Sequence, residues 1–198
     1  NKPSGLLTVP GKRAQHKDSV ATRVQRVLPN ATIVHRLDMA TSGVLIMALN
    51  KPAHVEISRQ FEKRETQKNY VARVYGAIEK DSGSVEEPLI CDWPNRPKQK
   101  VDYEHGKPSL TNYQVIEREQ ETTLVKLMPV TGRSHQLRVH MLSLGHPIIG
   151  DRLYAHDKAL ALSTRLQLHA AYLQIKHPTS KEPMVFESSC PFNQYEKF

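Results

Sequence analysis

The sequence predicts an α+β fold built on a largely antiparallel mixed sheet flanked by helices and loops. Short strand candidates recur along the chain, separated by Pro, Gly or charged residues, and only a few helix candidates lie between them. The 198 residues include no internal repeat, low-complexity tract or long Gly/Ser linker, and they suffice for one ordinary domain. We therefore expect a single domain over residues 1–198.

The first elements are expected around residues 43–49. Residues 1–5, which begin with Asn1 rather than Met, resemble the exit of a strand that began upstream, so we expect the N-terminus to be truncated. Residues 43–49 are continuously apolar between polar neighbours, which predicts a buried central strand. Pro52 then opens a helix in which apolar residues, Ile57 among them, recur four apart.

Further strands are expected along the rest of the chain. Residues 70–75 form the clearest candidate, with Tyr70, Ala72 and Val74 on one face and Arg73 on the other. The other candidates share the same short length and the same polar boundaries: residues 110–116, 124–128, 168–175 and 184–187.

A second helix is predicted over residues 135–144. Leu137 and Met141 lie one helical turn apart on its apolar face. Ser134 is placed to cap its N-terminus, and Gly145 is placed to end it.

The composition favours a polyanionic partner and excludes a membrane-spanning protein. The formal net charge is +8, from 28 Lys and Arg against 20 Asp and Glu. The longest apolar run, residues 44–49, is far shorter than the roughly 20 residues that cross a bilayer. The only two cysteines, Cys91 and Cys190, have no metal-binding spacing. We expect a reduced, cytoplasmic protein without a structural zinc.

The segment of residues 93–100 is basic and interrupted by proline, which predicts an exposed loop. Its cations Arg96, Lys98 and Lys100, together with Arg133 elsewhere, are candidate phosphate contacts. The alternative is that these side chains are simply solvated.

The strongest chemical candidate is the polar turn that precedes residues 43–49. It places Arg36 and Asp38 close together before a buried segment, where sheet scaffolds often present catalytic groups. Taken alone, Asp38 is better explained as an ordinary turn residue next to Arg36.

The motifs of the whole chain together resemble the RluA family of pseudouridine synthases. They share their order with that family: HRLD at 35–38, TSG at 41–43, KNYVARVYG at 68–76, TGRSHQLRVHM at 131–141 and GHPIIGDRLYA at 145–155. The opening residues 1–5 are similar to the family's first motif. The segment of residues 89–101 resembles the branch that acts on both a tRNA anticodon loop and 23S ribosomal RNA.

This resemblance implies an enzyme that isomerises uridine in RNA to pseudouridine without metal or organic cofactor. Asp38 matches the catalytic aspartate. An ionised carboxylate is compatible with three routes: attack on C1′, addition to the pyrimidine ring, or removal of a ribose proton. Glycosidases also meet the positive character at a sugar carbon with a carboxylate.

The other site residues follow from the same motifs. Tyr70 matches the tyrosine that stacks on the target uracil, and Arg138 matches the cation that keeps the aspartate ionised. Outside the motif, they are typical of an ordinary strand tyrosine and a solvated helix arginine. Arg36 matches the residue that occupies the space of the flipped nucleotide, and Leu137 matches an apolar wall of the base pocket.

The histidines His35, His135 and His140 are expected in polar networks or facing RNA, with His35 counted among the substrate-binding residues. Their spacing does not fit a zinc-binding HExxH motif. We expect a monomer that binds structured stem-loops, because unstacked loop bases are readable. The alternatives are a family member that acts on ribosomal RNA only, or a non-catalytic RNA-binding module.

Overall fold

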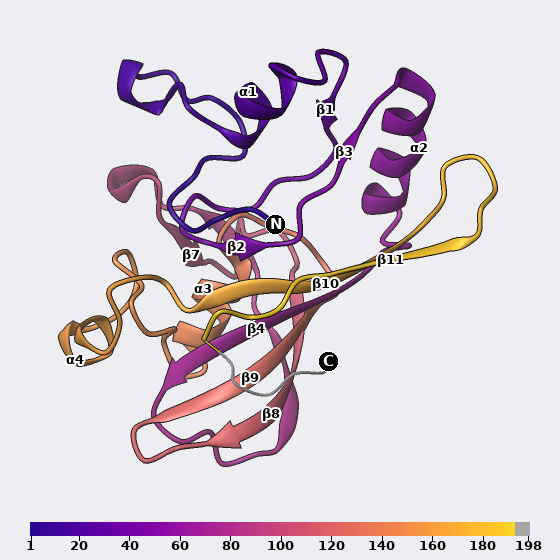
Figure 1. Cartoon of the computed structure of the whole chain (residues 1–198). Helices are drawn as coiled ribbons and strands as arrows, with labels where there is room; N and C mark the ends of the chain where they lie inside the picture. Colours follow the sequence, from indigo (N-terminus) through magenta and orange to yellow (C-terminus); the bar gives the residue numbers. More distant parts are fainter. Residues whose placement is uncertain (193–198) are drawn as a thin grey trace. The chain divides into compact units, whose positions relative to one another are not determined.

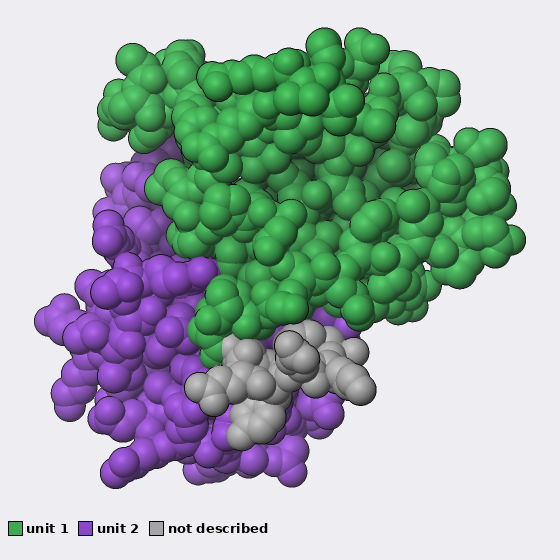
Figure 2. All heavy atoms as spheres, viewed as in Figure 1, with its two compact units in different colours: residues 1–68, 169–198 green, residues 69–168 purple. Residues whose placement is uncertain are grey.

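The computed structural model describes residues 1–192, and the chain forms two compact units. Unit 1 consists of Asn1–Lys68 and the chain from His169 onward, and unit 2 consists of Asn69–Leu168 (Figure 2). The expectation of a single domain over residues 1–198 stays a prediction.

Unit 1 contains short strands, small helices and a β-hairpin (Figure 1). Strand β10 pairs in antiparallel register with β11 and in parallel with β2, while β1 pairs with β3. Its elements are η1 (Ala14–His16), α1 (Val20–Gln25), β1 (Thr32–Ile33), β2 (Ser42–Gly43), β3 (Met47–Ala48), α2 (Lys51–Glu62), β10 (Leu168–Lys176) and β11 (Pro183–Glu187).

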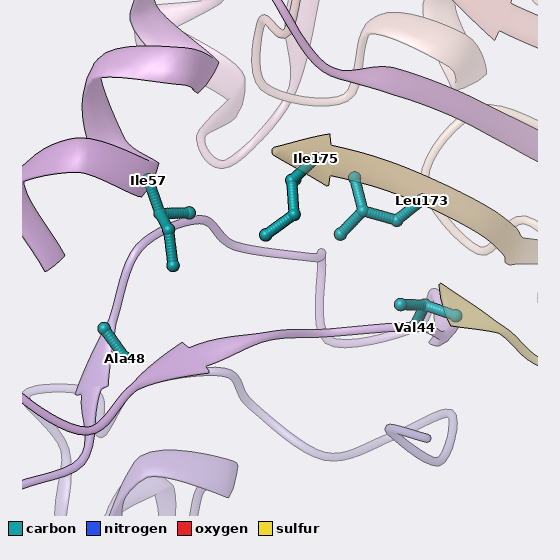
Figure 3. Packing of buried hydrophobic residues seen from close by; sticks show 5 residues of the cluster. All are labelled: Val44, Ala48, Ile57, Leu173 and Ile175. Carbon is teal, nitrogen blue, oxygen red and sulfur yellow. The ribbon is translucent and has the colours of Figure 1, made fainter. Parts of the chain in front are cut away.

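Apolar side chains from α2, β3 and β10 form the core of unit 1 (Figure 3). Ile57 of α2, Ala48 of β3 and Leu173 and Ile175 of β10 are buried together with Val44. Helix α2 begins where predicted, because Asn50 accepts the Ala53 N–H at 2.9 Å and proline follows in the first turn.

The prediction of one central strand over residues 43–49 was wrong. This stretch forms parts of β2 and β3 instead, because its backbone changes partner twice. The Val44 N–H donates to the Ala170 carbonyl of β10, and the Ile46 N–H donates to the His35 ring. Ala48 then pairs with Thr32 of β1.

Unit 2 is built on an antiparallel ladder in the order β4-β9-β8-β5, so the expected α+β class with a largely antiparallel sheet is confirmed. A separate hairpin pairs β6 with β7. The elements are β4 (Gln67–Tyr75), β5 (Ser82–Glu86), β6 (Leu89–Cys91), η2 (Trp93–Asn95), β7 (Gln99–Val101), β8 (Leu110–Arg118), β9 (Thr122–Pro129), α3 (Gln136–Ser143) and α4 (Asp157–Ala161).

The longer predicted strands are confirmed as β4, β8, β9, β10 and β11. Strand β4 is buried on both faces, since Val71 and Ala72 are both fully buried and lie on opposite faces. Residues 93–98 form the largely exposed tip of the β6–β7 hairpin, as predicted, and residues 99 and 100 belong to strand β7.

Helix α3 ends as predicted but starts differently. Gly145 follows its last turn with φ +90°, a conformation that glycine adopts easily. Ser134 does not cap the helix, because His135 occupies the cap position with φ +54° and makes no capping side-chain bond. Within residues 1–192, no helix is long and apolar enough to cross a membrane.

Candidate active site

In unit 1, the turn that carries Asp38 is held by hydrogen bonds on both sides of that residue. The Asp38 carbonyl accepts the Thr41 N–H at 3.1 Å, which closes the turn. On the preceding side, the Thr8 hydroxyl donates to the Leu37 carbonyl at 2.8 Å. On the following side, the Ser4 hydroxyl donates to the Ala40 carbonyl at 2.7 Å. The backbone around the partly buried Asp38 is therefore fixed in place.

Lys2, which belongs to the first motif of the chain, also holds the turn around Asp38 in place. Its side chain is almost wholly buried, with 2% exposure. The ammonium donates to the carbonyls of Met39 at 3.0 Å, Leu6 at 2.6 Å and Pro3 at 3.0 Å. A buried charge is tolerated only when it is hydrogen-bonded, so Lys2 ties the chain start to the residue after Asp38.

Gly43 anchors the other end of the turn. Its φ of +112° and its close packing both exclude a side chain, because a Cβ would lie 2.2 Å from the Ala170 carbonyl oxygen. Next to it, Ser42 bonds to Nδ1 of the buried His169 at 2.8 Å. The Nε2 of that ring donates to the Ser188 carbonyl at 3.1 Å, so Nδ1 accepts the serine proton.

His35 precedes Asp38 in the sequence, and its side chain makes packing contacts. Its ring stacks on Phe61 at 4.6 Å, and its Nε2 accepts the Ile46 N–H. Burial and the nearby charge of Lys68 lower the pKa of His35 to about 4, so the imidazole is neutral at pH 7. Arg36, next to it, is exposed. RNA binding by His35 stays a prediction.

In unit 2, Arg138 lies in a buried ion pair that sequence reasoning did not identify. Its Nε and one terminal nitrogen each donate to a carboxylate oxygen of Asp151 at 2.7 Å. The side chains are 5% and 0% exposed. The same carboxylate accepts the Leu153 N–H at 2.9 Å. Two parallel bonds fix the plane of the guanidinium, so Arg138 is a positioned cation rather than a solvated helix residue.

Tyr154 connects this ion pair to the β6–β7 hairpin. Its ring lies 5.0 Å from the Arg138 guanidinium, and its hydroxyl bonds to His135 Nδ1 at 2.6 Å. The same hydroxyl accepts the Gln99 N–H of β7 at 2.8 Å. The Tyr154 hydroxyl therefore links strand β7 of the hairpin to His135, the residue that precedes helix α3.

Gln136 organises the turn that leads into α3. Its amide oxygen accepts from the Thr131 hydroxyl at 2.7 Å and from the Arg133 N–H at 3.0 Å. Its amide nitrogen donates to the Leu110 carbonyl of β8 at 3.0 Å. The turn is thereby tied to the sheet, with Arg133 exposed on its surface.

The remaining predicted residues are also in unit 2. Tyr70 is partly buried on β4 opposite Leu127 of β9, and Leu137 is buried on α3 with 7% exposure. Arg96 and Lys100 are exposed on the β6–β7 hairpin, and Lys98 is partly exposed there.

The predicted site residues are thus divided between the units. Asp38, Arg36 and His35 belong to unit 1, and the others belong to unit 2. Sequence reasoning missed Asp151 and Tyr154 as partners of Arg138, although the family motif at residues 145–155 contains both. It also missed Lys2, for which the opening motif was the only signal. In residues 1–192, no group of three or more His, Cys, Asp or Glu side chains is arranged to hold a metal ion.

Comparison with known proteins identifies the family of the chain. The sequence profile described as RNA pseudouridylate synthase matches residues 1–143. The chain is 60% identical to the dual-specificity RNA pseudouridine synthase RluA of Yersinia pestis, over 97% of this chain and 94% of that protein. It is 59% identical to RluA of Escherichia coli (strain K12), over 97% of this chain and 88% of that protein.

Two solved human structures share the fold. Human RNA Pseudouridylate Synthase Domain Containing 1 matches with a TM-score of 0.81 and 31% identity, over 98% of this chain and 79% of that one. Human RNA Pseudouridylate Synthase Domain Containing 4 matches with a TM-score of 0.76 and 25% identity, over 96% of this chain and 84% of that one. With the motifs and the profile match, these similarities show that the chain belongs to the RNA pseudouridylate synthase family and is an RNA pseudouridine synthase.

Proposed function

We propose that this enzyme modifies uridines in two RNAs, the anticodon loop of a tRNA and a stem-loop of 23S ribosomal RNA. The observation that carries the proposal is the 60% identity over 97% of the chain to a protein named a dual-specificity RNA pseudouridine synthase. The charge of +8 supports a partner that presents many phosphates.

Asp38 is the essential carboxylate of this proposal. The reaction breaks the bond between C1′ and N1 of uridine, turns the uracil, and joins C5 to C1′. The proton lost from C5 is balanced by the proton gained at N1, so no oxidant, reductant or cofactor is needed. The hydrogen bonds around Asp38 support this role, because a carboxylate on a fixed backbone loses little entropy when it meets the ribose or the base.

Tyr70 and Arg138 act with Asp38. Flipping a base out of its stack costs a few kcal/mol, and one aromatic stacking contact returns roughly 1–3 kcal/mol, so Tyr70 offsets much of this cost. Arg138 is the cation of the proposed catalytic set. The Asp151 carboxylate supports that role, since it holds the guanidinium in one orientation.

The other residues bind the RNA. Arg36 fills the position of the flipped nucleotide, because a planar guanidinium both stacks and contacts phosphate. Leu137 forms an apolar wall beside the base. The exposed cations contact phosphates: Arg96, Lys98, Lys100 and Arg133. The proposed enzyme is a cytoplasmic monomer with one catalytic domain.

The two substrates are tested with RNA carrying tritium at C5 of uridine, because conversion to pseudouridine releases that label to water. Two transcripts are compared at equal concentration, a tRNA anticodon stem-loop and a 23S ribosomal stem-loop. We expect release from both, with kcat/KM values within about a hundredfold of each other, a difference of about 3 kcal/mol. A duplex without a loop serves as the control. Release from the ribosomal stem-loop alone contradicts dual specificity, and binding without release from either contradicts catalysis on these RNAs.

A further inference from the structure

An exposed aromatic ring lies beside a guanidinium at the tip of the β6–β7 hairpin. Trp93, the only tryptophan of the chain, is 65% exposed. The guanidinium carbon of Arg96 lies 3.9 Å from the centre of the Trp93 ring system. Single exposed apolar residues are common on protein surfaces, but a stacked Trp–Arg pair offers a flat, positively charged π surface.

The tip that carries this pair is held by its own hydrogen bonds. The Asp92 N–H donates to the Lys98 carbonyl at 2.9 Å, and the Lys98 N–H donates to the Asn95 carbonyl at 3.0 Å. The Asn95 amide donates to the Asp92 carboxylate at 2.8 Å. Because these bonds close the tip, the backbone that carries Trp93 has little conformational freedom left to lose on binding.

The hairpin is also tied to the body of unit 2. The Gln99 N–H of β7 donates to the Tyr154 hydroxyl at 2.8 Å, and the same hydroxyl contacts His135 just before α3. A surface that is fixed to the helix carrying Arg138 is suited to positioning a ligand. A freely moving loop is not.

The charge around the ring favours nucleic acid. Residues 89–101 contain three cations and one carboxylate, Asp92, whose oxygen is bonded to Asn95. Of the three cations, Lys100 pairs with Asp102 at 3.5 Å. Cations alone would fit any polyanion, including an acidic peptide. The added flat ring specifically fits a nucleobase, since every base has a π face and phosphates flank it on both sides.

We propose that Trp93 and Arg96 form a stacking platform for an unpaired base of the RNA substrate, at a position other than the target uridine. This inference rests on the proposed function and adds a specificity-determining contact to it. The platform selects RNA whose loop bases are unstacked, because a base inside a continuous duplex has no free face to offer.

Tryptophan fluorescence reports on the platform directly because Trp93 is the only tryptophan. We expect a substrate stem-loop to quench this fluorescence and to shield it from acrylamide, and a blunt duplex of the same stem sequence to do neither. Trp93→Ala is expected to weaken stem-loop binding and raise KM roughly 5- to 150-fold, the range for one lost stacking contact. Trp93→Phe keeps a ring and should weaken binding less.

Tyr103→Ala is the matched control, because Tyr103 is a second highly exposed aromatic residue of unit 2, with 79% exposure. We expect it to leave Kd and KM unchanged. The inference is overturned if Trp93→Ala binds the stem-loop as the parent does, or if Tyr103→Ala weakens binding equally. Either result with an active parent leaves the proposed function standing, whereas a parent that releases no tritium contradicts the proposed function itself.

Discussion

Arg138 and Asp151 illustrate how single residues acquire a role through buried contacts. The guanidinium is held by two bonds of 2.7 Å to a carboxylate that solvent does not reach. A buried ion pair adds little net stability over apolar residues of the same size, but breaking one is costly because a charge is left without its partner. The role that best explains this pair is that Asp151 holds the Arg138 guanidinium in one orientation.

Asp151→Asn keeps the side-chain size and removes its charge. We expect the free energy of unfolding to fall by about 3–5 kcal/mol, and kcat to fall about 100-fold because Arg138 is displaced. Urea denaturation and single-turnover tritium release measure the two effects. Asp81→Asn is the control, since it breaks the exposed ion pair with Arg118, and it should change neither quantity appreciably. If the Asp151 variant has the same kcat as the parent, the proposal that Asp151 positions Arg138 is contradicted.

The lowered pKa of His35 predicts that the free energy of unfolding depends on pH. Its folded pKa of about 4 lies below the ordinary value of 6.5, because burial and Lys68 disfavour the charged form. The unfolded chain therefore binds the proton more readily. The stability that comes from the neutral His35 is fully present above pH 6.5, and it is lost as the pH falls from 6.5 through 4.

We expect this residue to lower the free energy of unfolding by on the order of 1–2 kcal/mol between pH 7 and pH 5. His35→Gln retains an acceptor for the Ile46 N–H and removes the titration, so its stability should vary less over that interval. Urea denaturation at both pH values measures the difference. His105→Gln, at an exposed site of unit 2, should behave as the parent. An identical pH dependence in the His35 variant would contradict the assignment.

At the scale of elements, length and periodicity decided what the sequence could predict. Strands β4, β8, β9 and β10 were found because each has eight or nine residues with a strong apolar signal. The two-residue strands β1, β2 and β3 depend on long-range partners, and no local pattern encodes these. The run of residues 43–49 was misread as one strand for the same reason.

Gly43 tests the packing of β2 against β10. We expect Gly43→Ala to destabilise the protein by several kcal/mol, because the new Cβ would overlap the Ala170 carbonyl and the backbone would be strained. Gly145→Ala is the matched control, since Gly145 also has a positive φ but a Cβ added there would meet no atom within 4 Å. It should cost only about 1–2 kcal/mol. Thermal melts measure both, and equal losses would contradict the close approach at Gly43.

At the scale of the whole molecule, the sequence predicted the family, but it did not predict the contacts that support the candidate residues. The motifs also indicated Asp38, Tyr70 and Arg138 as catalytic candidates, and their catalytic roles stay predictions. Their supporting contacts depend on the fold. Ser42 and His169 are 127 residues apart, and Arg138 and Asp151 lie on different segments, so no local pattern predicts either contact.

The most direct test of the central claim compares the parent with Asp38→Asn in single-turnover tritium release from the tRNA stem-loop. The variant keeps the shape of the side chain and removes its charge, so circular dichroism and RNA affinity should match those of the parent. We predict release by the parent and none above background by Asp38→Asn, because only a carboxylate can take part in breaking the bond between C1′ and N1. Release by a folded, RNA-binding Asp38→Asn variant would contradict the role of Asp38 and place the catalytic centre elsewhere.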